Sequence, residues 1–438
     1  MRRLSVALAG LLILSIGGLR PSSSDTSCPM PGAASLLSEA RLLAIEQENG
    51  CTDEEAEPAQ GVWPDWQSAT VAGGDVAPAR IVADSYPTFH SVVVDAENDR
   101  VFVSDPNRHA LWSYERLAAS KGREAATSLT SVRGPSTGMM FVAGVTVDPK
   151  AREVFTVDND IGDRLMVFPY DADGNVKPKR VLSVPHRAWG ISINHARDEM
   201  AISVEDPREI VIYKRDASGS DQPLRTIRGP RTGLGDPHGV FYDGTNNEIV
   251  VANHGNVSGR QAAPGDAPPR RRRAAPSSDE PVVGGRFEMP SITVYPGTAK
   301  GDVAPVRRIQ GSQTGLNWPM ALDVDLRHNE VAVANNGDSS IRVFRRTASG
   351  DVAPLRVIKG ARTGINGPMG IAFDVQNDEI WLANYGDHTA LVFARTATGN
   401  VAPKRVLRNA PAGSPTVGFG NPGAVAYDSK RDELLVPN

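Results

Sequence analysis

Short runs of alternating apolar and polar residues recur along most of the chain, and each run ends in Asp or Asn. Seven copies align, and their last residues lie 46 to 54 positions apart except across one gap of 82. The copies are His90–Asp95, Ala143–Asp148, Trp189–Asn194, His238–Asp243, Met320–Asp325, Met369–Asp374 and Gly423–Asp428. Alternation with a period of two predicts a strand at each copy.

Each copy is followed by material for three more strands. In the unit after Met320–Asp325 these are Glu330–Asn335, Ile341–Phe344 and, after a Gly-Asp-Val-Ala-Pro turn, Leu355–Lys359. Four short strands per unit, joined by Gly, Asn and Asp turns at this period, are typical of β-propeller blades. No helical periodicity occurs after Asn49.

The two ends of the repeat array predict how the ring closes. The last copy stops at Asn438, directly after its second strand, and residues 68–83 supply strands of the third and fourth type. Strands from both ends would then share one blade, which removes two exposed sheet edges. We therefore expect an all-β chain with a single seven-bladed β-propeller over residues 67–438, closed by N-terminal strands pairing with the C-terminal half blade.

The segment before the repeats has the features of export. Met1, Arg2 and Arg3 precede an apolar run, so residues 1–23 are predicted to be a signal peptide, with an uncleaved anchor as the alternative. Residues 24–66 contain a predicted helix over 33–49, bracketed by Cys28 and Cys51. In an exported chain this favours a disulfide over two free thiols. We expect a secreted or periplasmic protein with no membrane span beyond the signal segment.

The gap of 82 residues holds an insertion at about 255–290, rich in Pro and Arg, which we expect to be disordered. Its four consecutive arginines favour a solvated tether over an anion-binding site. The formal net charge of the whole chain is −4, which gives no indication of a nucleic-acid partner.

Histidines gather on one predicted face of the ring. Loops leading into first strands and loops between second and third strands share a face, and six of the eight histidines map there. On this face we expect a binding surface that includes His109, Trp189, His254, Met320, Met369 and His388, with His186 nearby. The candidates for catalysis are His90 and His238, which begin two first strands.

Two rings of residues could hold a metal. His90 and His238, with Met320 and Met369, offer ligands for a soft or borderline ion such as zinc, although packing is the favoured interpretation. The second strands end in Asp105, Asp158, Glu205, Asn253, Asn335, Asn384 and Asn438, where turn capping is favoured over calcium binding. Asp158, Asp160 and Asp163 form the best calcium candidate. The arginines that follow Pro-x before the fourth strands, Arg180 and Arg356 among them, are expected to be solvated guards of the sheet edges.

The unit Gly367–Asp374, followed by Asp378–Asn384 and Leu391–Phe393, resembles NHL-type bacterial propeller repeats. The chain is also distantly similar to the peptide α-amidating lyases, in which Pro-His-Gly supplies zinc-binding histidines. Pro237–Gly239 matches that pattern, whereas the third expected histidine is missing. Streptogramin lyases resemble the predicted fold without a matching catalytic motif, and the Glu that gluconolactonase-like proteins place at the first strand is absent.

These observations favour a binding module over an enzyme. We expect an exported NHL-like propeller that binds a protein or a glycan through the face carrying the histidines, with no certain cofactor. The alternative is a lyase or hydrolase that depends on a divalent metal, calcium or zinc, with its site at the channel mouth.

Overall fold

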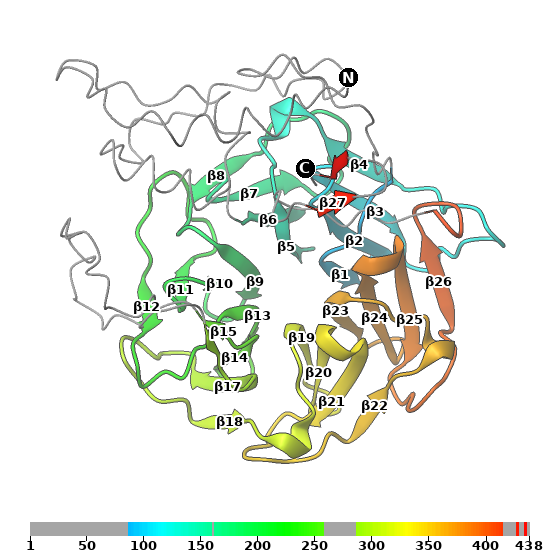
Figure 1. Ribbon diagram of the computed structural model, residues 1–438. Helices are drawn as coiled ribbons and strands as arrows, with labels where there is room; N and C mark the ends of the chain where they lie inside the picture. The colour runs from blue at the N-terminus through cyan, green and yellow to red at the C-terminus, as the bar shows by residue number, and fades with distance from the viewer. Residues whose placement is uncertain (1–85, 160–161, 258–285, 415–425, 429–432, 436–438) are drawn as a thin grey trace, which may run out of the picture. The chain divides into compact units, whose positions relative to one another are not determined.

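The computed structural model describes residues 86–159, 162–257, 286–414, 426–428 and 433–435, and the chain divides into two units. The unit that spans residues 82–420 contains six antiparallel four-stranded sheets, the blades of a β-propeller (Figure 1). Blades one to three comprise β1 (Val92–Asp95), β2 (Arg100–Asp105), β3 (Ala110–Glu115), β4 (Thr130–Arg133), β5 (Val142–Asp148), β6 (Glu153–Asp158), β7 (Arg164–Pro169), β8 (Arg180–Ser183), β9 (Ala188–Asn194), β10 (Glu199–Val204), β11 (Glu209–Lys214) and β12 (Arg225–Arg228). Blades four to six comprise β13 (Pro237–Asp243), β14 (Glu248–Asn253), β17 (Ser291–Pro296), β18 (Arg307–Ile309), β19 (Pro319–Asp325), β20 (Glu330–Asn335), β21 (Ser340–Arg345), β22 (Arg356–Ile358), β23 (Pro368–Asp374), β24 (Glu379–Asn384), β25 (Thr389–Ala394) and β26 (Arg405–Arg408).

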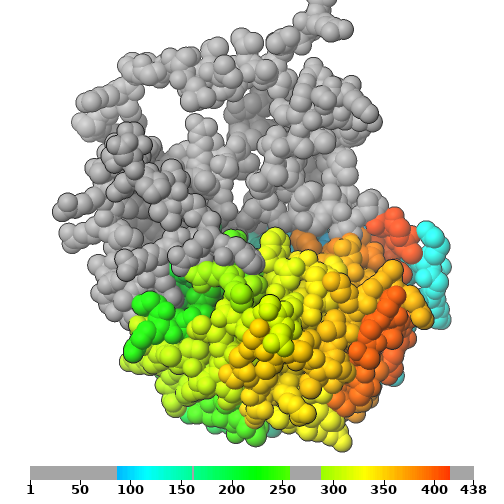
Figure 2. Space-filling model, turned by 60° about the horizontal axis from the view of Figure 1, so that its bottom comes forward, coloured from blue at the N-terminus to red at the C-terminus, as the bar shows by residue number. Residues whose placement is uncertain are grey.

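The first strand of each blade is innermost and lies beside the first strand of the next blade, in the order β1, β5, β9, β13, β19 and β23. Six hydrophobic clusters fill the six seams between adjacent blades. Because each sheet is covered on both faces, the second strands are buried along their whole length, as in β24, except for the first residue of β14. In the space-filling view the fourth to sixth blades pack side by side (Figure 2).

The predicted number of blades was wrong, because the ring closes directly between the sixth and first blades. β23 lies beside β1, and a methyl group on Gly370 would come within 2.7 Å of the Cα of Ser91. Trp381 is fully buried in a cluster that joins these two blades. At one rim of the seam Arg116 Nη1 lies 3.2 Å from Asp374 Oδ2. A seventh sheet has no room here, so the propeller has six blades.

The outer edge of the same seam is also occupied. In the connection between β3 and β4, the amide of Ser120 donates to the carbonyl of Val406 at 3.0 Å, and that of Ala126 donates to Arg408 at 2.6 Å. The seventh repeat unit is described only by β27 (Ala426–Asp428) and β28 (Glu433–Leu435), which pair antiparallel as a first and second strand should. Residues 68–83, predicted to complete that blade, lie outside the described residues.

The arginines of the fourth strands are paired with glutamates, which corrects the expectation of solvated edge guards. Arg356 donates to both carboxylate oxygens of Glu330, at 2.8 and 2.7 Å, and its side chain is 16% exposed. The same bidentate bond joins a fourth-strand arginine to a second-strand glutamate in the pairs Arg180–Glu153, Arg225–Glu199, Arg307–Glu248 and Arg405–Glu379. We call these five pairs the arginine latches.

Turns between the third and fourth strands protect the neighbouring sheet edges. Gly399 forms a parallel bridge to Ile358 of the preceding blade, and its φ of 75° favours glycine. The side chain of Asn400, the next residue, accepts the amide of Arg362 in that blade at 2.8 Å. The Gly-Asp/Asn motif therefore joins blades as well as turning the chain, and it covers an edge strand that would otherwise be open.

Five short 3-10 helices are the only helices among the described residues: η2 (Pro135–Thr137), η3 (Ser312–Thr314), η4 (Asn336–Asp338), η5 (Ala361–Thr363) and η6 (Tyr385–Asp387). Within that part of the chain no helix has the length and apolar character needed to cross a membrane. β15 (Asn256–Val257) pairs with β16 (Arg286–Phe287) at the base of the predicted insertion. The signal peptide, the helix over 33–49, Cys28, Cys51 and residues 258–285 lie outside the described residues.

Candidate functional site

Six aromatic and imidazole rings form a continuous row across one mouth of the propeller channel. The centroid distances along it are 5.8 Å, 5.0 Å, 4.4 Å, 5.0 Å and 5.0 Å. The row, which we call the aromatic arc, runs in the order Tyr385, His90, Trp189, His238, His254 and Trp318. The arc brings together residues of five blades, and it includes both histidines that the sequence singled out as catalytic candidates.

His90 is fully buried in the arc, between Tyr385 and Trp189. Its Nδ1 lies 2.8 Å from the carbonyl of Ala143, and its Nε2 is buried without a hydrogen-bond partner. Burial lowers the pKa of His90 to about 4, the bond to Ala143 opposes this, and the proximity of His238 lowers it further. The Trp189 ring lies against both imidazoles, 5.0 Å from His90 and 4.4 Å from His238. A metal ion shared by His90 and His238 stays a prediction.

His238 faces two carboxylates. Its Nε2 lies 3.5 Å from Glu205 Oε1, and its Nδ1 lies 3.0 Å from the carbonyl of Asp236 and 3.7 Å from the carboxylate of the same residue. One ligand atom from each of Glu205, Asp236 and His238 falls within 4.8 Å of the others. Burial lowers the pKa of His238, with a smaller opposing contribution from Asp236. Neutral imidazole is the form that binds metals.

Most polar residues at the ends of the second strands cap the loop that leads into the first strand. The side chains of Asp105, Asp158, Asn253, Asn335 and Asn384 each accept the amide of a residue 17 or 18 positions earlier in the chain. This geometry supports the capping interpretation. In blade three the expectation that Glu205 ends the second strand was wrong, because β10 ends at Val204 and Glu205 is the next residue. The Glu205 carboxylate accepts Asn159 Nδ2 at 3.3 Å and faces His238.

The two described carboxylates of the candidate calcium loop after β6 differ in burial. Asp158 is buried and accepts the amide of Met140 at 2.9 Å, whereas Asp163 is half-exposed and bonds to His186 Nδ1 at 2.9 Å. Burial raises the pKa of Asp158 to about 8. Asp160 lies outside the described residues, so the calcium site stays a prediction.

The residue before the first strand has left-handed backbone in four blades. The φ angles of Arg187, Asp236, Trp318 and Gly367 lie between 51° and 64°. Only the last of these is glycine, the residue that adopts this conformation without cost. A large aromatic residue rarely does so, and such strain is retained where the side chain has a role. Trp318 is 44% exposed at the end of the aromatic arc.

Four other residues predicted for this face, two histidines and two methionines, lie around the channel mouth. His109 Nδ1 contacts the carbonyl of Met140, and His388 Nδ1 lies 2.7 Å from the carbonyl of Pro87. Met320 and Met369 line the channel below the arc, and Asn336 Nδ2 lies 3.4 Å from the sulfur of Met369. All four therefore surround the mouth, although none belongs to the arc.

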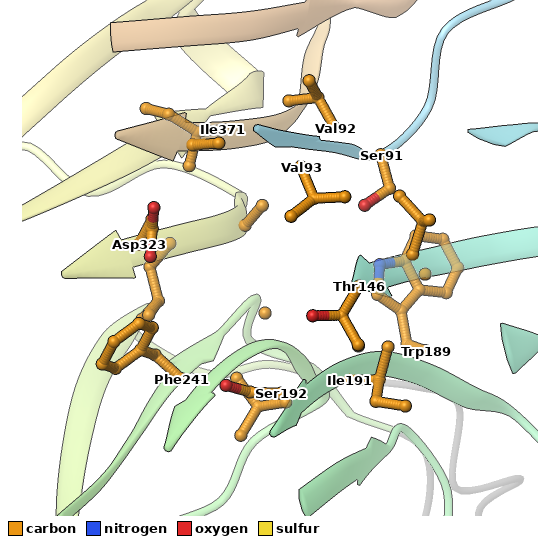
Figure 3. A pocket seen from close by; sticks show the side chains of 18 of the residues that line it. Ser91, Val92, Val93, Thr146, Trp189, Ile191, Ser192, Phe241, Asp323 and Ile371 are labelled. Carbon is orange, nitrogen blue, oxygen red and sulfur yellow. The ribbon is translucent and has the colours of Figure 1, made fainter. Parts of the chain in front are cut away.

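The channel beneath the arc is narrow, with a cavity of about 220 Å³. Its walls are largely apolar, with Thr146, Ser192 and Asp323 among the polar residues (Figure 3). Asp323 accepts the amide of Phe373 in the next blade at 2.7 Å, and burial raises the pKa of its carboxyl to about 7. The cavity is smaller than the pockets of roughly 300 Å³ or more that enclose drug-sized ligands.

Two residues of this face, Asp236 and Trp318, were missed as site candidates, and Glu205 was expected only in the ring for which turn capping was favoured. The sequence placed Glu205 one position too early, since the residue of blade three that matches the capping Asp and Asn is Val204. For Asp236 and Trp318 the sequence places each directly before a Pro that begins a first strand, but it does not give their approach to His254.

No family model and no curated protein matches the chain. Solved structures similar to it include one from the nidogen/laminin complex (11% identity, covering 74% of this chain and 93% of that one, TM-score 0.45). Another is a protein of unknown function from Desulfotomaculum acetoxidans (15%, 76% and 90%, TM-score 0.48), and a third is the WD40 β-propeller domain of Doa1 (12%, 81% and 90%, TM-score 0.44). The β-propeller fold and its six blades rest on this chain's own strand pairing, and membership of the NHL-type repeats stays a prediction.

Proposed function

We propose that this protein is an exported binding module that engages a partner protein with the face carrying the aromatic arc, and that Trp318 is the anchor of the interface. The observation that carries the proposal is an indole exposed by 44% on a backbone conformation that disfavours it. Exposed Trp residues are enriched among the residues that dominate binding energy at protein interfaces.

The surroundings of Trp318 support an interface rather than an enclosed ligand site. Met289, exposed by 56%, lies in the loop before β17, and loops between second and third strands share this face. Aromatic residues and methionine are enriched at protein interfaces. The channel cavity of about 220 Å³ is too small to hold a large ligand, so recognition falls to the surface around the mouth.

The variant Trp318→Gly separates binding from folding. Glycine adopts the left-handed conformation freely, so the free energy of unfolding should change by less than about 1 kcal/mol. Loss of the indole should weaken partner binding by about 30-fold or more. The matched control is Leu355→Ala, which removes a comparably exposed apolar side chain at the start of the fourth strand of blade five.

The measurement uses immobilised wild-type protein and both variants, exposed to envelope and secreted proteins of the same cells and, separately, to a panel of soluble oligosaccharides. We expect a protein that is retained by the wild type and by Leu355→Ala but lost with Trp318→Gly. Protection of residues 318–320 from hydrogen exchange by the purified partner would locate the interface. Equal retention by Trp318→Gly would refute the proposal, and quenching of indole fluorescence by a sugar alone would assign the face to glycans instead.

A further inference from the structure

We propose that Glu205, Asp236, His238 and His254 form a binding site for a divalent transition-metal ion of the Zn²⁺ type at the channel mouth. The site includes His238 and His254 of the aromatic arc but not Trp318, and it can be tested apart from the partner-binding proposal because its ligand groups are largely buried and it needs only the metal. Two carboxylates and two imidazoles are a ligand set that suits zinc, whereas calcium prefers oxygen ligands alone.

The distances between the ligand atoms are close to those that a metal requires. Ligand atoms about 2.0–2.1 Å from a tetrahedral ion lie roughly 3.3–3.5 Å from one another. His238 Nε2 lies 3.5 Å from Glu205 Oε1, and His254 Nδ1 lies 3.1 Å from Asp236 Oδ2. Small side-chain rotations would bring the remaining pairs together, since the atoms of the first three residues already fall within 4.8 Å.

The hydrogen bonding of His238 leaves its Nε2 available to coordinate a metal ion. Its Nδ1 is 3.0 Å from the carbonyl of Asp236, which can only accept, so Nδ1 carries the proton. The lone pair is then on Nε2, which faces Glu205. A backbone carbonyl that fixes the second nitrogen in this way is a regular feature of metal-binding histidines. Asn159 Nδ2 donates to Glu205 Oε1 at 3.3 Å and orients the carboxylate.

His254 gives the second, independent indication. Its side chain is nine-tenths buried, and its Nδ1 has no hydrogen-bond partner although it lies 3.1 Å from Asp236 Oδ2. A buried nitrogen left without a hydrogen bond is costly unless another ligand satisfies it. A metal ion between His254 and Asp236 would satisfy this nitrogen and neutralise the carboxylates.

The test is titration of the full chain, freed of metal by a chelator, with ZnCl₂ and with CoCl₂. We expect one equivalent to bind at this site, a rise in Tm that the chelator reverses, and cobalt absorption bands of a four- or five-coordinate nitrogen–oxygen site. Glu205→Gln, Asp236→Asn and His254→Gln should each weaken zinc binding by about 100-fold or more, and Asn159→Ala by about 10-fold. Asparagine tolerates the left-handed conformation found at Asp236, so this variant keeps the loop.

The matched control is His186→Gln, which removes an exposed histidine on the same face. It should bind zinc like the wild type. Because the full chain also carries Cys28 and Cys51, the ligand variants decide where the metal binds. Zinc affinity unchanged in Glu205→Gln and Asp236→Asn, or no saturable binding by the wild type, would overturn the proposal. Partner binding by Trp318 is measured separately, so the two proposals fail independently.

Discussion

A single carboxyl group illustrates how this repeat uses buried polar residues. Asp158 accepts the amide of Met140 through Oδ2, while its Oδ1 is buried without a hydrogen bond. Asn253, Asn335 and Asn384 make the same cap with an uncharged amide. A charged group in this setting is disfavoured, which is why burial raises the pKa of Asp158 to about 8.

Asp158→Asn should stabilise the protein, and more strongly at alkaline pH. In the unfolded chain the carboxyl ionises near pH 4, whereas the folded state keeps its proton up to about pH 8. The folded wild type therefore loses stability as pH rises from about 4 to about 8, and the uncharged amide removes this loss. We expect a gain of about 1–3 kcal/mol at pH 8 and little change at pH 4, measured by urea unfolding. Destabilisation by Asp158→Asn in the presence of calcium would instead favour the calcium site.

Ion pairs between second-strand glutamates and fourth-strand arginines hold the strands of a blade together. In blade five, Glu330 of β20 receives two hydrogen bonds from Arg356 of β22 and a further one, at 2.9 Å, from Arg395 at the end of the third strand of blade six. Burial alone would raise the pKa of Glu330, but the bonds from both arginines outweigh it and hold the pKa below its ordinary value. The latch thus joins strands within a blade and also joins adjacent blades.

Glu330→Gln should lower the free energy of unfolding by about 2–3 kcal/mol at neutral pH, because two nearly buried guanidinium groups lose a charged acceptor. Since the folded pKa is lowered, the stabilisation is present above the unfolded pKa and is lost as pH falls through the folded value. The difference between the two proteins should therefore shrink in acid, as denaturant titrations at several pH values can show.

Asp378→Asn is the matched control for the latch. Asp378 also pairs with Arg395, but its side chain is 53% exposed. Exposed ion pairs contribute about 1 kcal/mol or less, so this substitution should change stability by less than about 0.5–1 kcal/mol. Similar losses for the two variants would contradict the buried latch.

The ring as a whole is held shut where its last and first blades meet. Trp381 in the core, Arg116 with Asp374 at one rim, and the amides of Ser120 and Ala126 at the outer edge all cross this seam. These contacts need no residue before 82 or after 420. The six blades therefore form a closed set of interfaces with no open edge at the seam.

A chain shortened to residues 82–420 should accordingly fold. We expect a cooperative thermal transition with a Tm within roughly 5 °C of the full chain, and a compact radius of gyration by small-angle scattering. A further substitution, Asp374→Ala, should lower the Tm of both chains, because it removes the buried carboxylate that pairs with Arg116 across the seam and leaves Arg116 only its more exposed partner Asp99. Failure of the shortened chain to fold would contradict a ring that these contacts alone can close.

The sequence was a good guide to local structure. Its apolar alternation located the first strands of all six blades, and the Gly-Asp/Asn turn predicted where the fourth strands begin. The polar caps at the ends of second strands were also identified, because Asp and Asn bond to nearby backbone whatever the global fold. Because strand direction alternates within a blade, the sequence also predicted a common face for most of the histidines, of which His90, His238 and His254 lie together in the aromatic arc.

Other features were decided only by tertiary structure. The number of repeats in the sequence does not give the number of blades in the ring, because that number depends on how each blade packs on the next. At the seam, the absence of a side chain on Gly370 lets β23 approach β1. The arginine latches and the meeting of Glu205, Asp236, His238 and His254 join residues from different strands or blades. Local patterning thus determined the strands, turns and caps, because the interactions that form them join residues close together in the sequence. The closed ring of six and the chemistry at its mouth arise from contacts between distant segments, which the pattern of one strand does not encode.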